Sequence, residues 1–272
     1  MRTLHLFAGV GGGLLADLIL GHTPIAAVEW DSYCCAVLRE RAADGWFPGL
    51  RVHEGDVRLF DPSEYAGQVD CIHAGFPCQD ISVAGRGVGI AGGRSGLVSE
   101  VFRAIDTIAP RFVFLENSPE IRNKGREVVL GRLVEMGYAW RDGEISAADV
   151  GANHLRSRWF CVATNADGMR QLQSEGSESN QRGRPGDGAE KDVRHADGLG
   201  CEGRESESLD EEERAKTHAA RIRDIPSDWW ATAPDLVRVA HGIPHRAHRI
   251  KGLGNGQVPL QAAAAWKLLG GP

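Results

Sequence analysis

Seven short apolar runs, separated by amphipathic stretches, organise the first 164 residues of this 272-residue chain. The runs are TLHLF (3–7), IAAVEW (25–30), VHEG (52–55), VDCIHAG (69–75), FVFLEN (112–117), AWRDGEISA (139–147) and RWFCVAT (158–164). Helix-like stretches such as 31–41 and 96–108 lie between several of them. Short apolar runs alternating with helices predict an α/β fold, with a mostly parallel sheet covered by helices on both faces. Such sheets bind ligands at the carboxyl ends of their strands.

The character of the sequence changes at residue 165. Residues 165–226 are polar, acidic overall and nearly free of aromatic side chains, which is typical of a flexible insert. Apolar periodicity resumes near Ser227 and ends in a helical pattern. We therefore expect three parts: a main domain over 1–164, an insert over 165–226, and a C-terminal segment over 227–272 that returns to the main domain.

Composition excludes several classes of protein. The formal net charge of −6 argues against a chain coated with nucleic acid, although local basic patches remain compatible with it. The sequence has no apolar run of about 18 residues and no basic leader ahead of an apolar core, so we expect a cytoplasmic protein without membrane contact. The six cysteines form no CxxC pair or zinc-finger spacing, which predicts reduced thiols and no metal site.

A glycine-rich turn and two acidic residues follow the first three apolar runs. The turn LFAGVGGG (6–13) has Leu14 where the dinucleotide fingerprint requires its third glycine. Glu29 lies at the end of the second run, where a carboxylate can accept hydrogen bonds from ribose hydroxyls. Asp56 follows the third run, where its carboxylate could meet an adenine amino group. Together they indicate an adenosine pocket without a phosphate cradle. That pocket suits S-adenosylmethionine better than a dinucleotide.

Three further stretches carry reactive side chains. GFPCQ places Cys78 directly behind a proline at the end of an apolar run. A buried cysteine usually acts only as a small apolar residue, but these neighbours indicate a reactive thiol. Glu116 closes the run FVFLEN, and a carboxylate there needs either a task or an ion-pair partner. HLRSRWF presents Arg156 and Arg158 on one face of an extended segment, where they could be solvated or could hold a phosphate or a base oxygen.

Five stretches occur in series: FAGVGGG, GFPCQ, ENSPEI, HLRSR and GNGQVP. In this order they resemble the principal motifs of the DNA (cytosine-5)-methyltransferases, over residues 3–164 and roughly 227–270. The resemblance implies a class I S-adenosylmethionine-dependent methyltransferase fold, Rossmann-like, with a small recognition segment in the insert. It also implies methyl transfer to C5 of a flipped-out cytosine in double-stranded DNA.

The resemblance assigns roles to the matching residues. Cys78 resembles the nucleophile that adds to cytosine C6, Glu116 the acid at N3 and the exocyclic amine, and Arg158 the residue at O2, supported by Arg156. The positions expected to line the cofactor pocket are Phe7, Gly9, Gly11, Glu29, Trp30, Asp56, Leu97 and Asn255. Those expected near the base are Phe76, Pro77, Gln79 and Asn117, and those expected on the DNA backbone are Arg86, Arg94, Arg246, Arg249 and Lys251.

Two other readings remain open. A tRNA cytosine-5 methyltransferase would carry the same motif set, and a catalytically inactive DNA-binding relative would share the fold. A methyltransferase acting on an exocyclic amino group is disfavoured, because the sequence has no DPPY-like or NPPY-like tetrapeptide. His154 stands where the arginine motif usually begins with glutamine. We expect a monomer that acts on duplex DNA, for which a cognate restriction endonuclease is a candidate partner.

Overall fold

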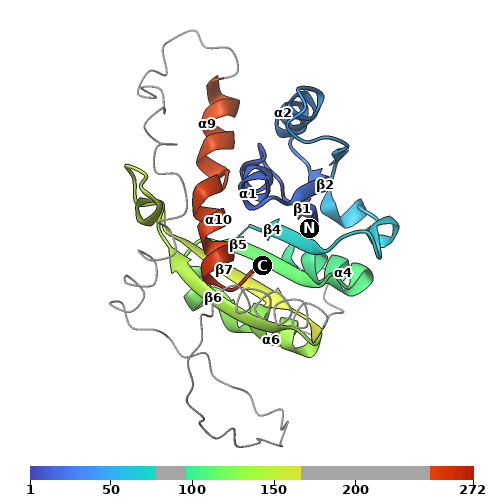
Figure 1. Cartoon of the computed structure of the whole chain (residues 1–272), viewed down its shortest axis with the longest axis vertical. Coiled ribbons are helices and arrows are strands. Elements are labelled where there is room, and N and C mark those ends of the chain that lie inside the picture. Colours follow the sequence, from blue (N-terminus) through green and yellow to red (C-terminus); the bar gives the residue numbers. More distant parts are fainter. Residues whose placement is uncertain (78–95, 167–245) are drawn as a thin grey trace, which may run out of the picture.

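A seven-stranded sheet forms the centre of the molecule (Figure 1). The computed structural model describes residues 1–77, 96–166 and 246–272. The strands are β1 (Arg2–Leu6), β2 (Thr23–Glu29), β3 (Arg51–Glu54), β4 (Cys71–Gly75), β5 (Phe112–Asn117), β6 (Ala139–Ile145) and β7 (Arg158–Thr164), in the spatial order β3-β2-β1-β4-β5-β7-β6. The pairs among β1 to β5 are parallel, and β7 runs antiparallel to both β5 and β6. The predicted mostly parallel α/β sheet is confirmed.

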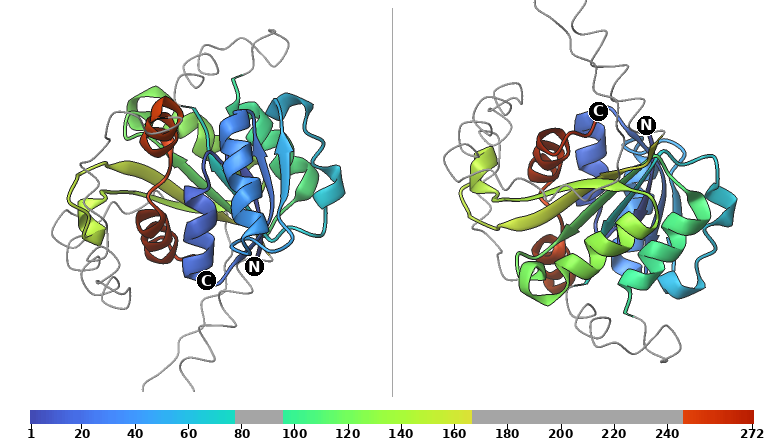
Figure 2. Two further views of the ribbon diagram at one scale, coloured as in Figure 1. Left: turned by 90° about the horizontal axis from the view of Figure 1, so that it is seen from above. Right: turned by 90° about the horizontal axis from the view of Figure 1, so that it is seen from below.

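Helices cover both faces of this sheet (Figure 2). The helices are α1 (Gly12–Leu20), α2 (Ser32–Ala43), α4 (Val98–Ile108), α5 (Ile121–Lys124), α6 (Arg126–Glu135), α9 (Arg246–Asn255) and α10 (Pro259–Leu268), with 3₁₀ turns η1 (Val57–Leu59), η2 (Ser63–Tyr65) and η4 (Ala148–Val150). Helices α1 and α10 pack together on one face, and α4 and α6 lie on the other. Among the helices of the described ranges, none has the length and apolar character that crossing a membrane requires.

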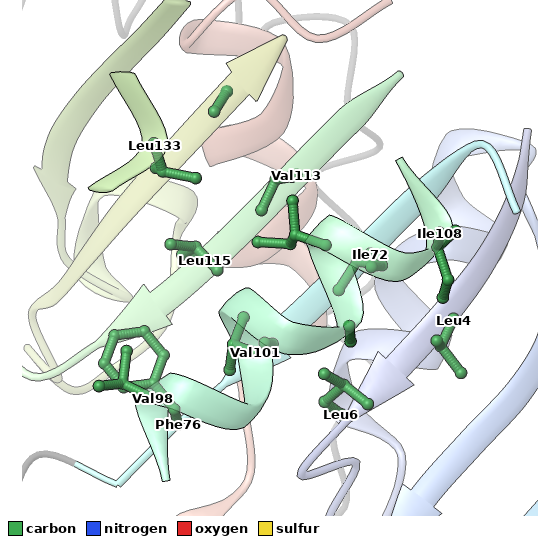
Figure 3. Packing of buried hydrophobic residues seen from close by; sticks show 14 of the residues in the cluster. Leu4, Leu6, Ile72, Phe76, Val98, Val101, Ile108, Val113, Leu115 and Leu133 are labelled. Atoms are coloured by element: carbon green, nitrogen blue, oxygen red, sulfur yellow. The ribbon is translucent and has the colours of Figure 1, made fainter. Parts of the chain in front are cut away.

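The strands alternate their side chains between two cores, as a pleated strand must. On β5, Val113 and Leu115 belong to the larger core, which the side chains of α4 and α6 complete. Figure 3 shows Val113 and Leu115 on the face of the sheet that α4 covers, with Val113 near Ile72 of β4 and Leu115 near Val101 of α4. The intervening Phe114 points to the opposite face and meets the edge of the Trp266 ring at 5.3 Å between centroids.

The C-terminal segment returns to the main sheet, as the sequence predicts. Ala262, Ala263 and Ala265 of α10 are buried in the second core, and such small side chains allow close packing. Gln261 is buried beside them and donates from Nε2 to the carbonyl oxygens of Ile145 (2.7 Å) and Arg156 (2.8 Å). These bonds tie α10 to the end of β6 and to the segment that leads into β7.

Glycines at the start of α1 let the α9–α10 junction approach. A Cβ on Gly12 would lie 2.3 Å from the carbonyl oxygen of Gln257, which is backbone and cannot move away cheaply. A Cβ on Gly13 would lie 2.8 Å from both Gln257 Oε1 and His73 Cε1. The glycines of the turn therefore serve the packing of the C-terminal segment as well as the loop.

A matched pair of glycine substitutions tests this close approach. Gly12→Ala should lower the free energy of unfolding by about 1–3 kcal/mol, because the new methyl group overlaps the Gln257 backbone. Gly131→Ala in α6, where nothing lies within 4 Å of the added Cβ, should raise it by about 0.5–1 kcal/mol through better helix propensity. Urea denaturation measures both values. Equal stability of Gly12→Ala and the wild type would show that α1 and the junction do not pack this tightly.

Candidate functional site

A pocket of about 230 Å³ opens where the first strands of the parallel sheet end. Its walls include six residues that the sequence analysis assigned to the cofactor or the base: Phe7, Glu29, Trp30, Asp56, Pro77 and Leu97. They come from the ends of β1 and β2, from the turn before η1, from the segment after β4 and from the residue before α4. The structure therefore brings together side chains that are far apart in the sequence.

Glu29 shapes one wall of this pocket. Its Oε2 accepts a hydrogen bond from Gly9 N (2.8 Å), and its Oε1 accepts from Trp30 N (3.0 Å) and Asp31 N (2.9 Å). A carboxylate has about four acceptor positions, so these three bonds leave roughly one for a ligand hydroxyl. Glu29 thus holds the glycine turn against the end of β2 and keeps one acceptor position for a bound group.

The rest of the pocket is aromatic, aliphatic and acidic. The side chain of Trp30 is 76 % exposed, which leaves an indole face open to a planar ligand. Phe7 has a φ of 59°, a left-handed conformation that is uncommon for a residue with a side chain and that turns the chain out of β1. Asp56 caps η1, with Oδ1 accepting from Arg58 N at 3.0 Å. Gly11, also predicted for this pocket, has a φ of 95° and starts α1, but is not among the residues lining it.

A second, smaller cavity of about 30 Å³ adjoins the first, because Phe7 lines both. Its walls include the predicted cofactor residues Gly9 and Asn255, and also Glu116. Other wall residues that were not singled out in the sequence include Gly75, His73 and Gln257. The candidate acid and the cofactor pocket are therefore neighbours across Phe7.

Glu116 lies at the end of β5 with only 12 % of its side chain exposed. Arg158 Nε lies 3.0 Å from Glu116 Oε1, and Gln257 Nε2 donates to Oε2 at 3.4 Å. Burial raises the pKa of Glu116, although Arg158, Gln257 and Arg156 oppose the rise. The predicted need for a partner is met by Arg158, and the raised pKa favours a group that can hold a proton.

Asn117 and Gly75 position the chain that leads to Cys78. Asn117 is buried and donates from Nδ2 to the carbonyl oxygen of Phe76 at 2.9 Å. A Cβ on Gly75 would lie 2.8 Å from Glu116 Oε2, so only glycine leaves room for the carboxylate beside β4. The segment from Gly75 to Pro77 is thereby fixed at its backbone directly beside Glu116.

The two arginines of the HLRSR motif bind different parts of the protein. The prediction that they share one face of an extended segment is wrong at Arg156, whose φ of 32° is left-handed, whereas Arg158 begins β7. Arg156 donates from Nη1 to the carbonyl oxygen of Gly254 (2.8 Å) and from Nη2 to that of Gly256 (2.6 Å). It binds the end of α9, while Arg158 binds Glu116. The left-handed turn at Arg156 thus goes with two acceptors at the C-terminal end of α9, the carbonyl oxygens of Gly254 and Gly256.

Helix α9 covers the start of α2. Lys251 Nζ lies 2.8 Å from Asp31 Oδ2, and the ring of His248 stacks on Tyr33 with 5.2 Å between centroids. Lys251 and the exposed Arg249 were predicted to contact the DNA backbone, and these two contacts remain predictions. Cys78, Gln79, Arg86, Arg94, the side chain of Arg246 and most of the 165–226 insert lie outside the described residues.

A buried polar cluster lies beneath the second cavity, between the sheet and α1. Asp17 of α1 contacts His5 Nε2 through Oδ2 at 2.6 Å and His22 Nδ1 through Oδ1 at 3.3 Å, and Thr3 donates to it as well. Burial opposes ionisation of Asp17, but His5 and His22 hold its pKa below the usual range. Burial lowers the pKa of His73 to about 3, and the neighbouring His5 adds to the effect. Sequence analysis missed this cluster, although a histidine inside each of the apolar runs TLHLF and VDCIHAG was a visible signal.

Comparison with known proteins identifies the class. A model of the C-5 cytosine-specific DNA methylase family matches residues 1–232, and the chain belongs to this family. The mostly parallel seven-stranded sheet is that of a class I S-adenosylmethionine-dependent methyltransferase, as the motifs implied. A mutant of DNMT2 from Spodoptera frugiperda has a similar fold, with a TM-score of 0.50 at 21% identity, over 60% of this chain and 50% of that one.

Curated relatives share the same region of sequence. The Type II methyltransferase M.CviJI of Paramecium bursaria Chlorella virus IL3A is 35% identical over 168 residues, which is 61% of this chain and 44% of the relative. The Type II methyltransferase M2.BsuMI of Bacillus subtilis (strain 168) is 33% identical over 174 residues, or 60% of this chain and 42% of the relative. The matched region thus spans less than half the length of either relative.

The buried histidine His73 predicts a pH dependence of stability. A histidine with an ordinary pKa of 6.5 when unfolded and about 3 when folded binds more protons in the unfolded state, so acid favours unfolding. Between pH 7 and pH 5 this group should lower the free energy of unfolding by about 2 kcal/mol. His73→Phe should remove that part of the slope in urea titrations at each pH.

A neighbour that does not titrate provides the control. The ring of Phe114 lies 4.6 Å from that of His73, and Phe114→Leu should lower stability about equally at both pH values. An unchanged pH slope in His73→Phe would mean that His73 titrates normally in the folded protein.

Proposed function

We propose that this chain transfers a methyl group from S-adenosylmethionine to C5 of a cytosine flipped out of double-stranded DNA. The observation that carries the proposal is the geometry around Glu116. A buried carboxyl group with a raised pKa and an arginine at 3.0 Å lies beside the backbone that leads to Cys78. This arrangement adjoins a pocket for an adenosine-containing cofactor across Phe7.

The residues present fit S-adenosylmethionine. The pocket has an acidic acceptor in Glu29, a second carboxylate in Asp56 and an open aromatic face in Trp30, with an aliphatic wall from Leu97. Acidic acceptors suit ribose hydroxyls and an adenine amino group, whereas a dinucleotide would need a phosphate cradle. The cofactor would supply a methyl group activated on a sulfonium sulfur.

The protein residues must make cytosine C5 nucleophilic. The Cys78 thiolate adds to C6 and forms a carbon–sulfur bond, and the ring electrons shift towards C5. Glu116 donates a proton or a hydrogen bond to N3 of the base. This stabilises the negative charge that the addition of the thiolate places on the ring. Arg158, which already pairs with Glu116, would hold the base oxygen O2. After methyl transfer, a base takes the C5 proton, the electron pair restores the ring, and the thiolate leaves.

The base must leave the helix for this chemistry. Ring atoms inside a stacked duplex are out of reach, and flipping the nucleotide costs a few kcal/mol. Asn117 holds the backbone of Phe76, two residues before Cys78, and so orders the described part of the segment that precedes the nucleophile. We further propose a monomer that acts in the cytoplasm, with a cognate restriction endonuclease as a candidate partner.

Trapping with a fluorinated substrate tests the mechanism. Duplex DNA carrying 5-fluorocytosine at the target should be methylated and then remain bound to Cys78, because fluorine cannot leave as a cation. The covalent complex should survive denaturing electrophoresis. Glu116→Gln should slow methylation of ordinary DNA by about two orders of magnitude or more, since it removes a positioned acid.

Two cysteine variants make the trapping result specific. Cys78→Ala should lose methylation and trapping while it still binds S-adenosylmethionine. Cys71→Ala, a buried thiol on β4 whose pKa burial raises, should keep both. A covalent complex with Cys78→Ala would contradict the proposed nucleophile. Trapping on tRNA in place of DNA would favour a tRNA cytosine-5 methyltransferase, which carries the same motifs.

Cofactor binding has its own test at Glu29. Glu29→Ala removes the acceptor for a ribose hydroxyl and releases the glycine turn, so the affinity for S-adenosylmethionine in calorimetry should fall by about tenfold to a hundredfold. Glu54 ends the neighbouring strand β3 and pairs with Arg39 outside the pocket, so Glu54→Ala should bind as the wild type does. Wild-type affinity in Glu29→Ala would place the cofactor elsewhere.

A further inference from the structure

Gln257 lies between Glu116 and the buried His73. Its Nε2 donates to Glu116 Oε2 at 3.4 Å. Its Oε1 and the Cε1 atom of His73 both lie 2.8 Å from the point that a Cβ on Gly13 would occupy. The absent side chain of Gly13 thus leaves open a space that borders both the amide oxygen and the imidazole.

This space holds polar atoms whose hydrogen bonds are incomplete. Among the residues the structure describes, Gln257 Oε1 and both ring nitrogens of His73 are buried without a hydrogen-bond partner. A buried polar atom without a partner is costly, and His73 is only 2 % exposed. Glu116, Gln257 and His73 also line the same cavity of about 30 Å³, so the amide has room to turn. A hydrogen bond between Gln257 Oε1 and one ring nitrogen of His73 would satisfy two of these three atoms.

Burial, together with the neighbouring His5, lowers the pKa of His73 and keeps its ring neutral. His5 of β1 lies at 4.7 Å between ring centroids and Phe114 of β5 at 4.6 Å, while Asp17 of α1 is engaged by His5 and His22. A neutral imidazole has an N–H on one side of Cε1 and a lone pair on the other. A small tilt of the ring can therefore offer either a donor or an acceptor to the amide.

We propose that Gln257 and His73 are positioning residues that form a neutral, two-state hydrogen-bonded couple, which follows the gain and loss of a proton at Glu116. The inference rests on the proposed function, in which Glu116 acts as an acid. Neither residue touches the cytosine in this account.

The two states differ in the direction of each hydrogen bond. With Glu116 ionised, Gln257 Nε2 donates to the carboxylate and His73 N–H donates to Oε1. With Glu116 protonated, the amide turns, its oxygen accepts from the carboxyl O–H, and Nε2 donates to the lone pair of His73. No proton passes along the couple and no charge forms in the core, so Glu116 can change state while the oxygen and the nitrogen of the Gln257 amide each keep a partner.

A metal-bound cluster is the alternative for these residues. The ligand atoms of His5, Asp17 and His73 lie within 4.8 Å of one another. However, Asp17 already accepts hydrogen bonds from His5 and Thr3 at one oxygen and contacts His22 at the other. These contacts are those of a hydrogen-bond network that already engages both oxygens of Asp17.

Opposite pKa shifts provide the test. The Glu116 pKa is read by carbon NMR titration of the chain labelled at glutamate Cδ, with Glu116→Gln to assign the resonance. Gln257→Met removes the donor to the carboxylate, so the pKa should rise by about one unit. In His73→Phe, the protonated state of Glu116 leaves an amide N–H of Gln257 unpaired, whereas the ionised state leaves only its carbonyl oxygen unpaired. A buried N–H without a partner is the costlier of the two, so the pKa of Glu116 should fall by about half a unit to one unit.

The double variant distinguishes a couple from two independent effects. Because His73 acts through Gln257, the double variant should show the Gln257→Met value alone. His73→Gln, whose amide offers both a donor and an acceptor, should return the pKa towards that of the wild type. If His73→Phe does not fold, His73→Leu takes its place in the cycle.

Three results would overturn the couple. The first is an unchanged Glu116 pKa in His73→Phe. The second is an equal effect of His73→Phe on that pKa in the wild type and in Gln257→Met. The third is a stoichiometric bound metal that is lost when His73 is substituted. The titration needs neither cofactor nor DNA, so it decides the couple even for a chain that fails to methylate. Methylation and trapping with unshifted pKa values would leave the proposed function standing without the couple.

Discussion

The cost of burying the carboxyl group of Glu116 governs the arrangement of the site. The group closes an apolar strand, and the low polarity of its surroundings penalises its charge. Arg158 from the antiparallel strand β7 and Gln257 from the C-terminal segment offset that cost. The balance leaves a carboxyl group that is stable in the fold and still able to hold a proton. A stronger partner would fix the charge, and a weaker one would make the site unstable.

Small residues make this arrangement possible. Gly75 leaves room for the carboxylate beside β4, and Gly12 and Gly13 let the α9–α10 junction reach across α1. Arg156 then holds the end of α9, and Gln261 fastens α10 to β6. A segment more than a hundred residues further along the chain thus completes a site that begins at the ends of β1 and β2. This explains why a glycine-rich turn without a complete dinucleotide fingerprint belongs here, since it accommodates the protein as well as a ligand.

The sequence predicted the sheet well because the signal was local. Each apolar run became a strand with bounds within two residues, and the alternation of runs and helices fixed the parallel arrangement. The gathering of Phe7, Glu29 and Asp56 around one pocket was predictable for the same reason, since each lies at or just after the end of a strand. The approach of Gln257 to Glu116, and to the cavity that His73 lines, was not predictable, because no local pattern encodes a contact between segments so far apart in the sequence. The turn at Arg156 was mispredicted because its acceptors, the carbonyl oxygens of Gly254 and Gly256, are placed beside it by tertiary packing.

The central claim is the identity of the methylated atom. Purified chain, duplex DNA and S-adenosylmethionine carrying a trideuterated methyl group would be incubated together, and the DNA digested to nucleosides for mass spectrometry. The account predicts the label in 5-methyl-2′-deoxycytidine, together with release of the C5 proton to water. Label in N4-methyl-2′-deoxycytidine or in a methylated adenine, with 5-methyl-2′-deoxycytidine unlabelled, would contradict it.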